Sequence, residues 1–108
     1  MLSIAAALLI HGYIVMAPEV HTFEPCGAPD PLWVDGEPEV LVELRMRYQE
    51  LAKQPYERTF AVLEGRAGGP LDCGFCEDYE GSFRIERVAL HRRVEEGDCR
   101  DEAEGPDR

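Results

Sequence analysis

Apolar runs separated by short polar or proline-rich breaks predict a small β protein. β-forming residues fill positions 13–16, and an extended pattern resumes at 20–23 after Ala17, Pro18 and Glu19. A proline inside a strand pattern is typical of an edge strand or a bulge. We therefore expect one long, bent first strand across both stretches, counted in the barrel as one strand or as two. The next stretch, 27–31, contains two prolines and a glycine and predicts a loop.

A short strand at 32–34 and the helix after it come next. Asp35-Gly36 is a turn dipeptide that would end the strand. Pro38 suits the first turn of a helix, and Pro55 would stop the helix two residues after Lys53. Apolar residues recur at helical spacing within these limits, at Leu41, Leu44, Tyr48 and Leu51. We expect this helix to cover one end or face of a sheet.

Two further strands are predicted at 56–66 and 82–92, with a loop from residue 65 to about 81. In the last strand, Phe83 and Ile85 have one parity and Val88 and Leu90 the other. Strict alternation cannot turn all four inward, so we expect a β-bulge near Glu86-Arg87. The order of strands around one helix predicts a mainly β fold, a small OB-like (oligonucleotide/oligosaccharide-binding) β-barrel.

The 108 residues suffice for one domain with a modest core. Residues 1–10 are apolar and rich in alanine, and they predict either a truncated export signal or the start of the first strand. A membrane anchor is the third interpretation, although the run is shorter than the ~20 residues that cross a bilayer. We expect the barrel domain at 11–94 and an acidic tail at 95–108, tethered at Cys99.

The net charge of −11 is spread unevenly. Residues 95–108 contain seven acids and two bases, a charge of −5 that leaves −6 for the rest of the chain. A surface that binds phosphates needs the opposite charge, so nucleic acid is not expected as a partner.

The four cysteines, Cys26, Cys73, Cys76 and Cys99, permit three disulfide connectivities. Cys26 follows the first long strand and Cys99 lies just beyond the last. First and last elements are neighbours in a closed barrel, so a Cys26–Cys99 pair is geometrically reasonable. Cys73 and Cys76 would then pair locally.

The sequence Cys73-Gly74-Phe75-Cys76 also permits two kinds of chemistry. A redox motif of this type opens a helix in a βαβ unit, whereas here it lies in an acidic loop, where neighbouring carboxylates raise a thiol pKa. A zinc-type site would need further ligands from Cys26, Cys99, His21 or His91, and no close-spaced pair is present. We therefore favour structural cysteines, with no catalytic residues and no cofactor, and keep metal or redox chemistry at Cys73 and Cys76 as the alternative.

The remaining candidates have an ordinary structural interpretation beside the functional one. His11, His21 and His91 are scattered on strand-like stretches and suggest surface or strand-face positions. Trp33 and Tyr79 could line a ligand-binding face, although a lone tryptophan on a short strand more often packs on the core. A cluster of three acids could bind a cation but suggests a solvated charge run: Glu77, Asp78 and Glu80.

Several short motifs resemble those of one family. They are Thr22-Phe23-Glu24-Pro25-Cys26-Gly27, Trp33 before a helix with Leu44, Tyr48 and Leu51, Phe60-Ala61-Val62-Leu63-Glu64-Gly65-Arg66, and Asp98-Cys99. Over roughly residues 12–99 the chain is similar to the C-terminal OB-fold domain of NlpE-type lipoproteins, which serve copper homeostasis and surface sensing at the outer membrane. The resemblance implies an envelope location and a Cys26–Cys99 disulfide.

The chain also departs from that family. We expect neither the family's separate N-terminal barrel domain nor its lipobox cysteine, and Cys73 and Cys76 are not part of the family pattern. Copper binding and stress signalling are therefore not carried over. The sequence predicts a non-catalytic binding or interaction module in the periplasm or cell envelope, with an envelope protein as its partner. The alternative is a copper- or zinc-handling or thiol–disulfide redox protein that uses Cys73 and Cys76.

Overall fold

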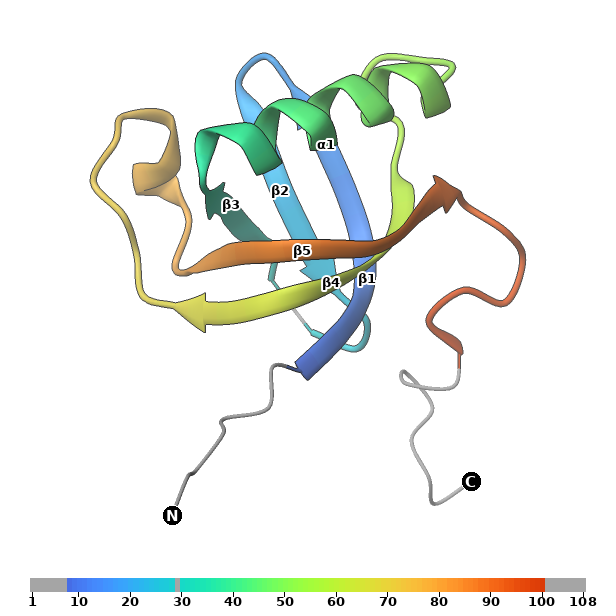
Figure 1. Cartoon of the computed structure of the whole chain (residues 1–108). Helices are drawn as coiled ribbons and strands as arrows, with labels where there is room; N and C mark the ends of the chain where they lie inside the picture. Colours follow the sequence, from blue (N-terminus) through green and yellow to red (C-terminus); the bar gives the residue numbers. More distant parts are fainter. Residues whose placement is uncertain (1–7, 29, 101–108) are drawn as a thin grey trace, which may run out of the picture.

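In the computed structural model, which describes residues 8–28 and 30–100, five strands close into a barrel that carries one α-helix (Figure 1). The elements are β1 (Leu8–Ala17), β2 (Val20–Pro25), β3 (Leu32–Gly36), α1 (Pro38–Leu51), β4 (Thr59–Gly68), the short 3-10 helix η1 (Phe75–Asp78) and β5 (Ser82–Arg93). The strands follow the order β1-β2-β3-β5-β4 around the barrel, and β4 pairs with β1 to close it. The β3–β5 pair is parallel and the others are antiparallel. The predicted mainly β, OB-like barrel with one helix is confirmed.

The N-terminal part differs from the expected single bent strand. Residues 13–16 and 20–23 lie in two antiparallel strands, β1 and β2, whose pairing begins at Ala17 opposite Val20. Pro18 has no backbone N–H to donate to a ladder and its φ is fixed, so the chain reverses there instead of bending. Residues 8–10 belong to β1, whereas the rest of the proposed signal segment, residues 1–7, lies outside the described residues.

Strand β4 begins and ends later than expected. It runs from Thr59 to Gly68, so the following loop occupies residues 69–81. Gly65 lets β4 pass close to β5, because a Cβ atom at this position would lie 2.2 Å from the Arg84 carbonyl oxygen and 2.8 Å from the Phe83 ring. Any side chain here would force the two strands apart.

Two β-bulges in β5 change which of its side chains face the barrel interior. The register with β4 shifts twice, leaving Glu86 and Ala89 without partners. The bulge predicted near Glu86-Arg87 is confirmed, and the one at Ala89 is additional. Because each bulge adds one residue, the residues opposite the inward positions of β4 are Phe83, Ile85, Val88 and His91.

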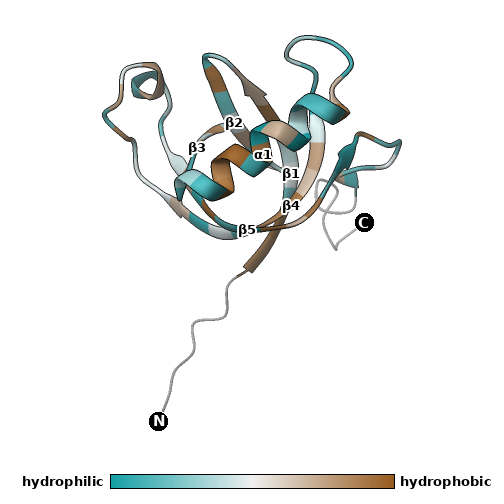
Figure 2. Cartoon of the chain, turned by 45° about the horizontal axis from the view of Figure 1, so that its top comes forward, coloured by the Kyte–Doolittle hydropathy of each residue, from teal (hydrophilic) through white to brown (hydrophobic). Residues whose placement is uncertain are grey.

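Helix α1 closes one side of the core. Leu44 and Tyr48 are buried among barrel residues that include Ile14, Phe23 and Ile85. Figure 2 shows α1 crossing the barrel with both hydrophobic and hydrophilic residues along its length. The helix therefore covers the barrel as predicted, and its two-sided pattern matches this position.

The helix ends at Leu51, two residues earlier than Lys53. The Glu57 carboxylate accepts hydrogen bonds from the N–H groups of Lys53 (2.6 Å) and Gln54 (3.1 Å). It also pairs with Arg93 at 2.8 Å, and the Arg93 hydrogen bond is the main reason that the pKa of Glu57 lies below its ordinary value. The Glu57 side chain thus satisfies two backbone N–H groups just after the end of α1.

Candidate functional site

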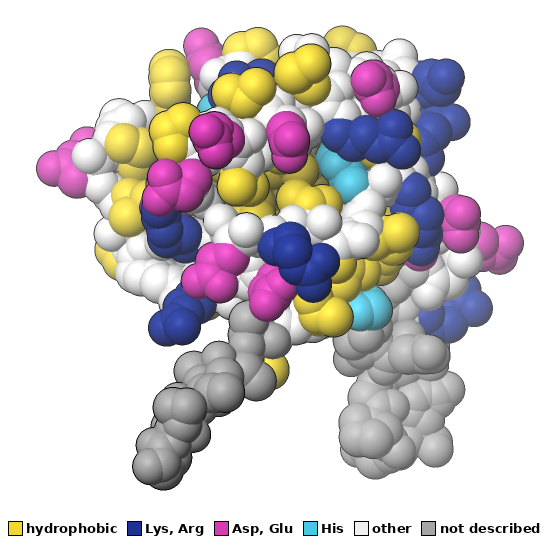
Figure 3. All heavy atoms as spheres, viewed as in Figure 1, with side chains coloured by type: hydrophobic (Ala, Val, Ile, Leu, Met, Phe, Trp, Pro, Cys, Tyr) yellow, Lys and Arg dark blue, Asp and Glu magenta, His cyan; other side chains and the backbone are white. Residues whose placement is uncertain are grey.

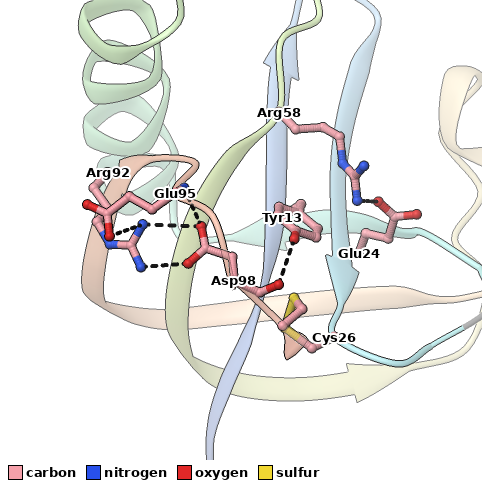
Figure 4. The surroundings of a disulfide bond; sticks show 8 residues. Tyr13, Glu24, Cys26, Arg58, Arg92, Glu95 and Asp98 are labelled. Atoms are coloured by element: carbon pink, nitrogen blue, oxygen red, sulfur yellow. Dashed lines mark hydrogen bonds and ion pairs between the residues drawn. A yellow bond between two sulfur atoms is a disulfide. The ribbon is translucent and has the colours of Figure 1, made fainter. Parts of the chain in front are cut away.

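The structure brings Cys26 and Cys99 together into a disulfide on the outside of the barrel, with 5.0 Å between their Cα atoms (Figure 4). Cys26 follows β2, and its N–H donates to the His11 carbonyl oxygen of β1 at 2.8 Å. The bond joins positions 73 residues apart in the chain. It attaches the segment after β5 to the β1–β2 side of the barrel.

Polar contacts hold the same segment beside the disulfide. Arg92 donates to both carboxylate oxygens of Asp98, at 2.9 and 3.2 Å, and the Asp98 carbonyl oxygen accepts from the Tyr13 hydroxyl at 3.2 Å (Figure 4). The Glu95 N–H donates to the same carboxylate at 2.7 Å. Hydrogen bonding from Arg92 is the main cause that lowers the pKa of Asp98. We call Tyr13, Arg92, Asp98, Cys26 and Cys99 the tail clamp.

Two arginines, Arg92 of the tail clamp and Arg58 beside it, pack on aromatic rings of the barrel. The Arg92 guanidinium lies 4.4 Å from the centre of the Phe60 ring, and that of Arg58 lies 3.9 Å from the centre of the Tyr13 ring. Arg58 also pairs with Glu24 at 3.0 Å. These arginines were not predicted from the sequence. The one pattern that could have indicated them is weak: an isolated base next to an outward-facing aromatic residue on a strand.

The second disulfide, Cys73–Cys76, lies in the β4–β5 loop, with Cα atoms 5.5 Å apart. Cys73 is exposed and Cys76, in η1, is fully buried. Gly74 between them has a φ of 81°, a conformation that glycine adopts without strain. Three acids, Asp72, Glu77 and Asp78, lie close to these cysteines in the sequence, and their charges would disfavour a thiolate if the bond were reduced.

The proposed metal ligands are not gathered into one site. Cys26 and Cys99 are joined to each other, and Cys73 and Cys76 form a separate disulfide. Across residues 8–28 and 30–100, no three His, Cys, Asp or Glu side chains are arranged to hold a metal ion. Within that same part of the chain, no helix has the length and apolar character to span a membrane.

The three histidines occupy different environments. His11 packs edge-on against Phe60, with 5.9 Å between ring centres. His21 stacks on Trp33 at 5.1 Å, and its pKa is lowered by partial burial and then by the charge of Arg45. His91 is buried inside the barrel, and burial, followed by the charge of Arg47, lowers its pKa to about 4.

Trp33 is buried between two half-buried rings rather than exposed as a flat platform. One neighbour is His21 and the other is Tyr79 of the β4–β5 loop, whose ring centre lies 5.3 Å away. The backbone N–H of Trp33 donates to the Gly81 carbonyl oxygen at 3.0 Å. These contacts fix the end of the loop against the start of β3.

A surface groove opens where the loop meets β3. It consists of two adjoining hollows of about 330 and 180 Å³ that share Asp30, Pro31 and Glu80. We call this hollow surface the loop groove, and its lining residues are Ala28, Asp30, Pro31, Leu32, Gly68, Asp78, Tyr79, Glu80 and Gly81. Tyr79, Asp78 and Glu80 were candidates from the sequence, whereas Asp30 and Leu32, which follow Cys26 closely in the chain, were not.

Comparisons with known proteins found no match: no family model, no curated protein and no solved structure is detectably similar to the chain. The resemblance to the NlpE-type domain therefore rests on the motifs within the sequence.

Proposed function

We propose that this protein is a non-catalytic binding or interaction module that works in the periplasm or cell envelope. The observation that carries the proposal is the pairing of Cys26, Cys73, Cys76 and Cys99 into two disulfides. Disulfides persist in oxidising compartments and are rare in the cytosol. The partner that we propose is an envelope protein, because the acidic chain disfavours nucleic acid.

The NlpE-type resemblance gives this proposal a more specific form. The OB-like strand order and the link between Cys26 and Cys99 both agree with what the resemblance implies. Cys73 and Cys76 lie outside the family pattern, so copper handling and stress signalling are not included in the proposal. The shared feature is a barrel whose C-terminal segment is fastened to its outer face.

Thiol–disulfide exchange at Cys73 and Cys76 is the second candidate function. One observation favours it: Cys73 is exposed on a protruding loop while its partner is buried. An incoming thiolate could attack the accessible Cys73 sulfur and release the Cys76 thiolate, with the attacking thiol supplying the electrons. The acidic loop opposes this chemistry, because the negative charges of the neighbouring acids disfavour a leaving thiolate.

A redox titration distinguishes the two functions. The protein is produced in an oxidising compartment, its disulfides are mapped by mass spectrometry, and it is equilibrated with glutathione buffers. A structural module keeps both bonds across the glutathione range, whereas an exchange protein loses Cys73–Cys76 near glutathione potentials. Free thiols in the exported protein would contradict the proposed compartment.

Photocrosslinking tests the binding role itself. Phe75 and Tyr56 are equally exposed aromatic residues, at 58%, and lie in different loops. A photoreactive phenylalanine at each position, introduced separately, should give a discrete adduct with an envelope protein from one position and not from both. If neither position gives an adduct, the interaction role is contradicted.

A further inference from the structure

The loop groove combines apolar lining with exposed carboxylates, which we call its rim. Leu32 and Pro31 line the larger hollow, and the half-buried Tyr79 lines the smaller one. The exposed acids of the rim are Asp30, Asp78 and Glu80. The larger hollow, about 330 Å³, reaches the lower end of the size range of ligand pockets. One large apolar side chain with polar flanks would fill it.

The groove has fixed walls. The Ser82 hydroxyl donates to the Gly69 carbonyl oxygen at 2.8 Å across the base of the loop, and Tyr79 packs on Trp33. A Cβ atom at Gly81 would lie 3.0 Å from both the Gly68 carbonyl oxygen and a Leu32 methyl group, so the chain is tightly packed here. A ligand would therefore meet a surface that is already formed, which lowers the entropic cost of binding.

The rim charges are not neutralised by neighbouring bases. Among the described residues, none of the three rim acids has an ion-pair partner, whereas Arg84 of β5 pairs with Asp35 and Glu37 instead. Figure 3 shows acidic and hydrophobic side chains together at the protruding end where the β4–β5 loop lies. Unpaired carboxylates around an apolar hollow attract a cation that carries apolar groups.

We propose that the loop groove docks an extended segment of a partner protein in which an apolar side chain is flanked by lysine or arginine. This rests on the proposed function as an interaction module and names the chemistry of its partner. The apolar side chain enters the hollow over Leu32, and the flanking bases pair with the rim acids. A second copy of this chain is a poor occupant, because its net charge is −11.

The test uses the full oxidised chain and a synthetic peptide of alternating lysine and leucine. Binding is followed by the amide NMR signals of Leu32, Tyr79 and Gly81, which should shift together and saturate. The matched peptide with glutamate in place of lysine should not shift them. Added salt should weaken binding, since the rim carboxylates are exposed.

Two charge variants separate site binding from general attraction. D30N/D78N/E80Q neutralises the rim, and exposed ion pairs of this kind should together account for about a tenfold loss of affinity. E19Q/E39Q/E43Q removes the same charge from exposed positions elsewhere and should leave affinity within about twofold. Equal losses in both variants would overturn the proposal.

Other occupants give different results, and each overturns the proposal. If calcium ions alone produce the same saturating shifts, the groove is a cation site. Self-association in sedimentation that the rim variant abolishes would make it an interface between copies. A missing peptide response together with a photocrosslinked adduct at Tyr56 refutes the groove and leaves the interaction module standing; no response and no adduct at either position refute both.

Discussion

Acidification from pH 7 to pH 4 should destabilise the fold through the buried His91. Thr59 donates its hydroxyl proton to the Ile14 carbonyl oxygen at 3.0 Å, so its oxygen accepts from His91 Nε2–H at 2.8 Å. Because burial lowers the pKa of His91 to about 4, the ring is neutral at pH 7, and within the described part of the chain its buried Nδ1 atom has no hydrogen-bond partner. Protonating this ring would place a charge inside the barrel, near Arg47.

The size of the effect follows from the pKa difference. In the folded protein the pKa of His91 falls from 6.5 to about 4, so the unfolded chain takes up the proton first. The stabilisation is complete above pH 6.5 and is lost as the pH falls towards 4. At about 1.4 kcal/mol for each pKa unit, the loss is roughly 3 kcal/mol at most.

Urea unfolding at closely spaced pH values measures this loss. H91Q is the matched variant, because its amide can still donate to Thr59 but does not titrate in this range. The free energy of unfolding should fall less steeply in H91Q between pH 6.5 and 4. His21 contributes with the same sign because its pKa is also lowered, so H21Q serves as the second control. Identical pH profiles for H91Q and the parent protein would refute the reasoning.

Three further perturbations test the fold and the tail clamp. Replacing Cys26 and Cys99 by serine opens a loop of 73 residues and should lower the free energy of unfolding by about 4 kcal/mol in chemical denaturation. The same replacement of Cys73 and Cys76 should lower it by only about 1.5 kcal/mol, because that loop is short. Equal losses would contradict the chain-entropy argument. D98N should lower the free energy of unfolding by about 1–2 kcal/mol and speed hydrogen exchange of residues 95–99, because the Asp98 side chain is 7% exposed and pairs with Arg92. Unchanged exchange would show that the disulfide alone holds the segment. G65A should lower the free energy of unfolding by about 3 kcal/mol or more in melting experiments, because its Cβ atom clashes with the Arg84 carbonyl oxygen. G69A is the control: it has open space around it and should leave stability unchanged. An unchanged G65A would refute the close approach of β4 and β5.

The sequence predicted elements well where one residue type forced a local outcome. Pro38 and the apolar spacing of Leu44 and Tyr48 indicated the helix, and the parity conflict along 83–90 indicated a bulge at Glu86. It failed at Pro18, because a proline is equally consistent with a bent strand and with the end of one. Only the pairing of β1 with β2, a long-range property, decides between them.

The candidate site was less accessible to sequence reasoning. Asp98 was recognised only as part of a motif, since its partners Arg92 and Tyr13 are brought to it by the closing of the barrel. The loop groove unites residues near 30 with residues near 80 for the same reason: the parallel β3–β5 pair joins them. No local pattern in the chain encodes either arrangement.

One disulfide lies in the loop before β5, and the other joins Cys26 to the segment after β5. This separation allows a reciprocal test. Strand β5 begins at Ser82, which follows Gly81 of the loop groove, and ends at Arg93, which follows Arg92 of the tail clamp. Removing Cys26 and Cys99 should lower the free energy of unfolding and leave binding of the lysine–leucine peptide intact. Removing Cys73 and Cys76 should weaken peptide binding, because the backbone N–H of Tyr79 donates to the Cys76 carbonyl oxygen. It should lower the free energy of unfolding by less than the loss of Cys26 and Cys99 does. If one pair controlled both properties, the clamp and the groove would be a single coupled unit, and the proposed division between a stabilising end and a binding end of the barrel would fail.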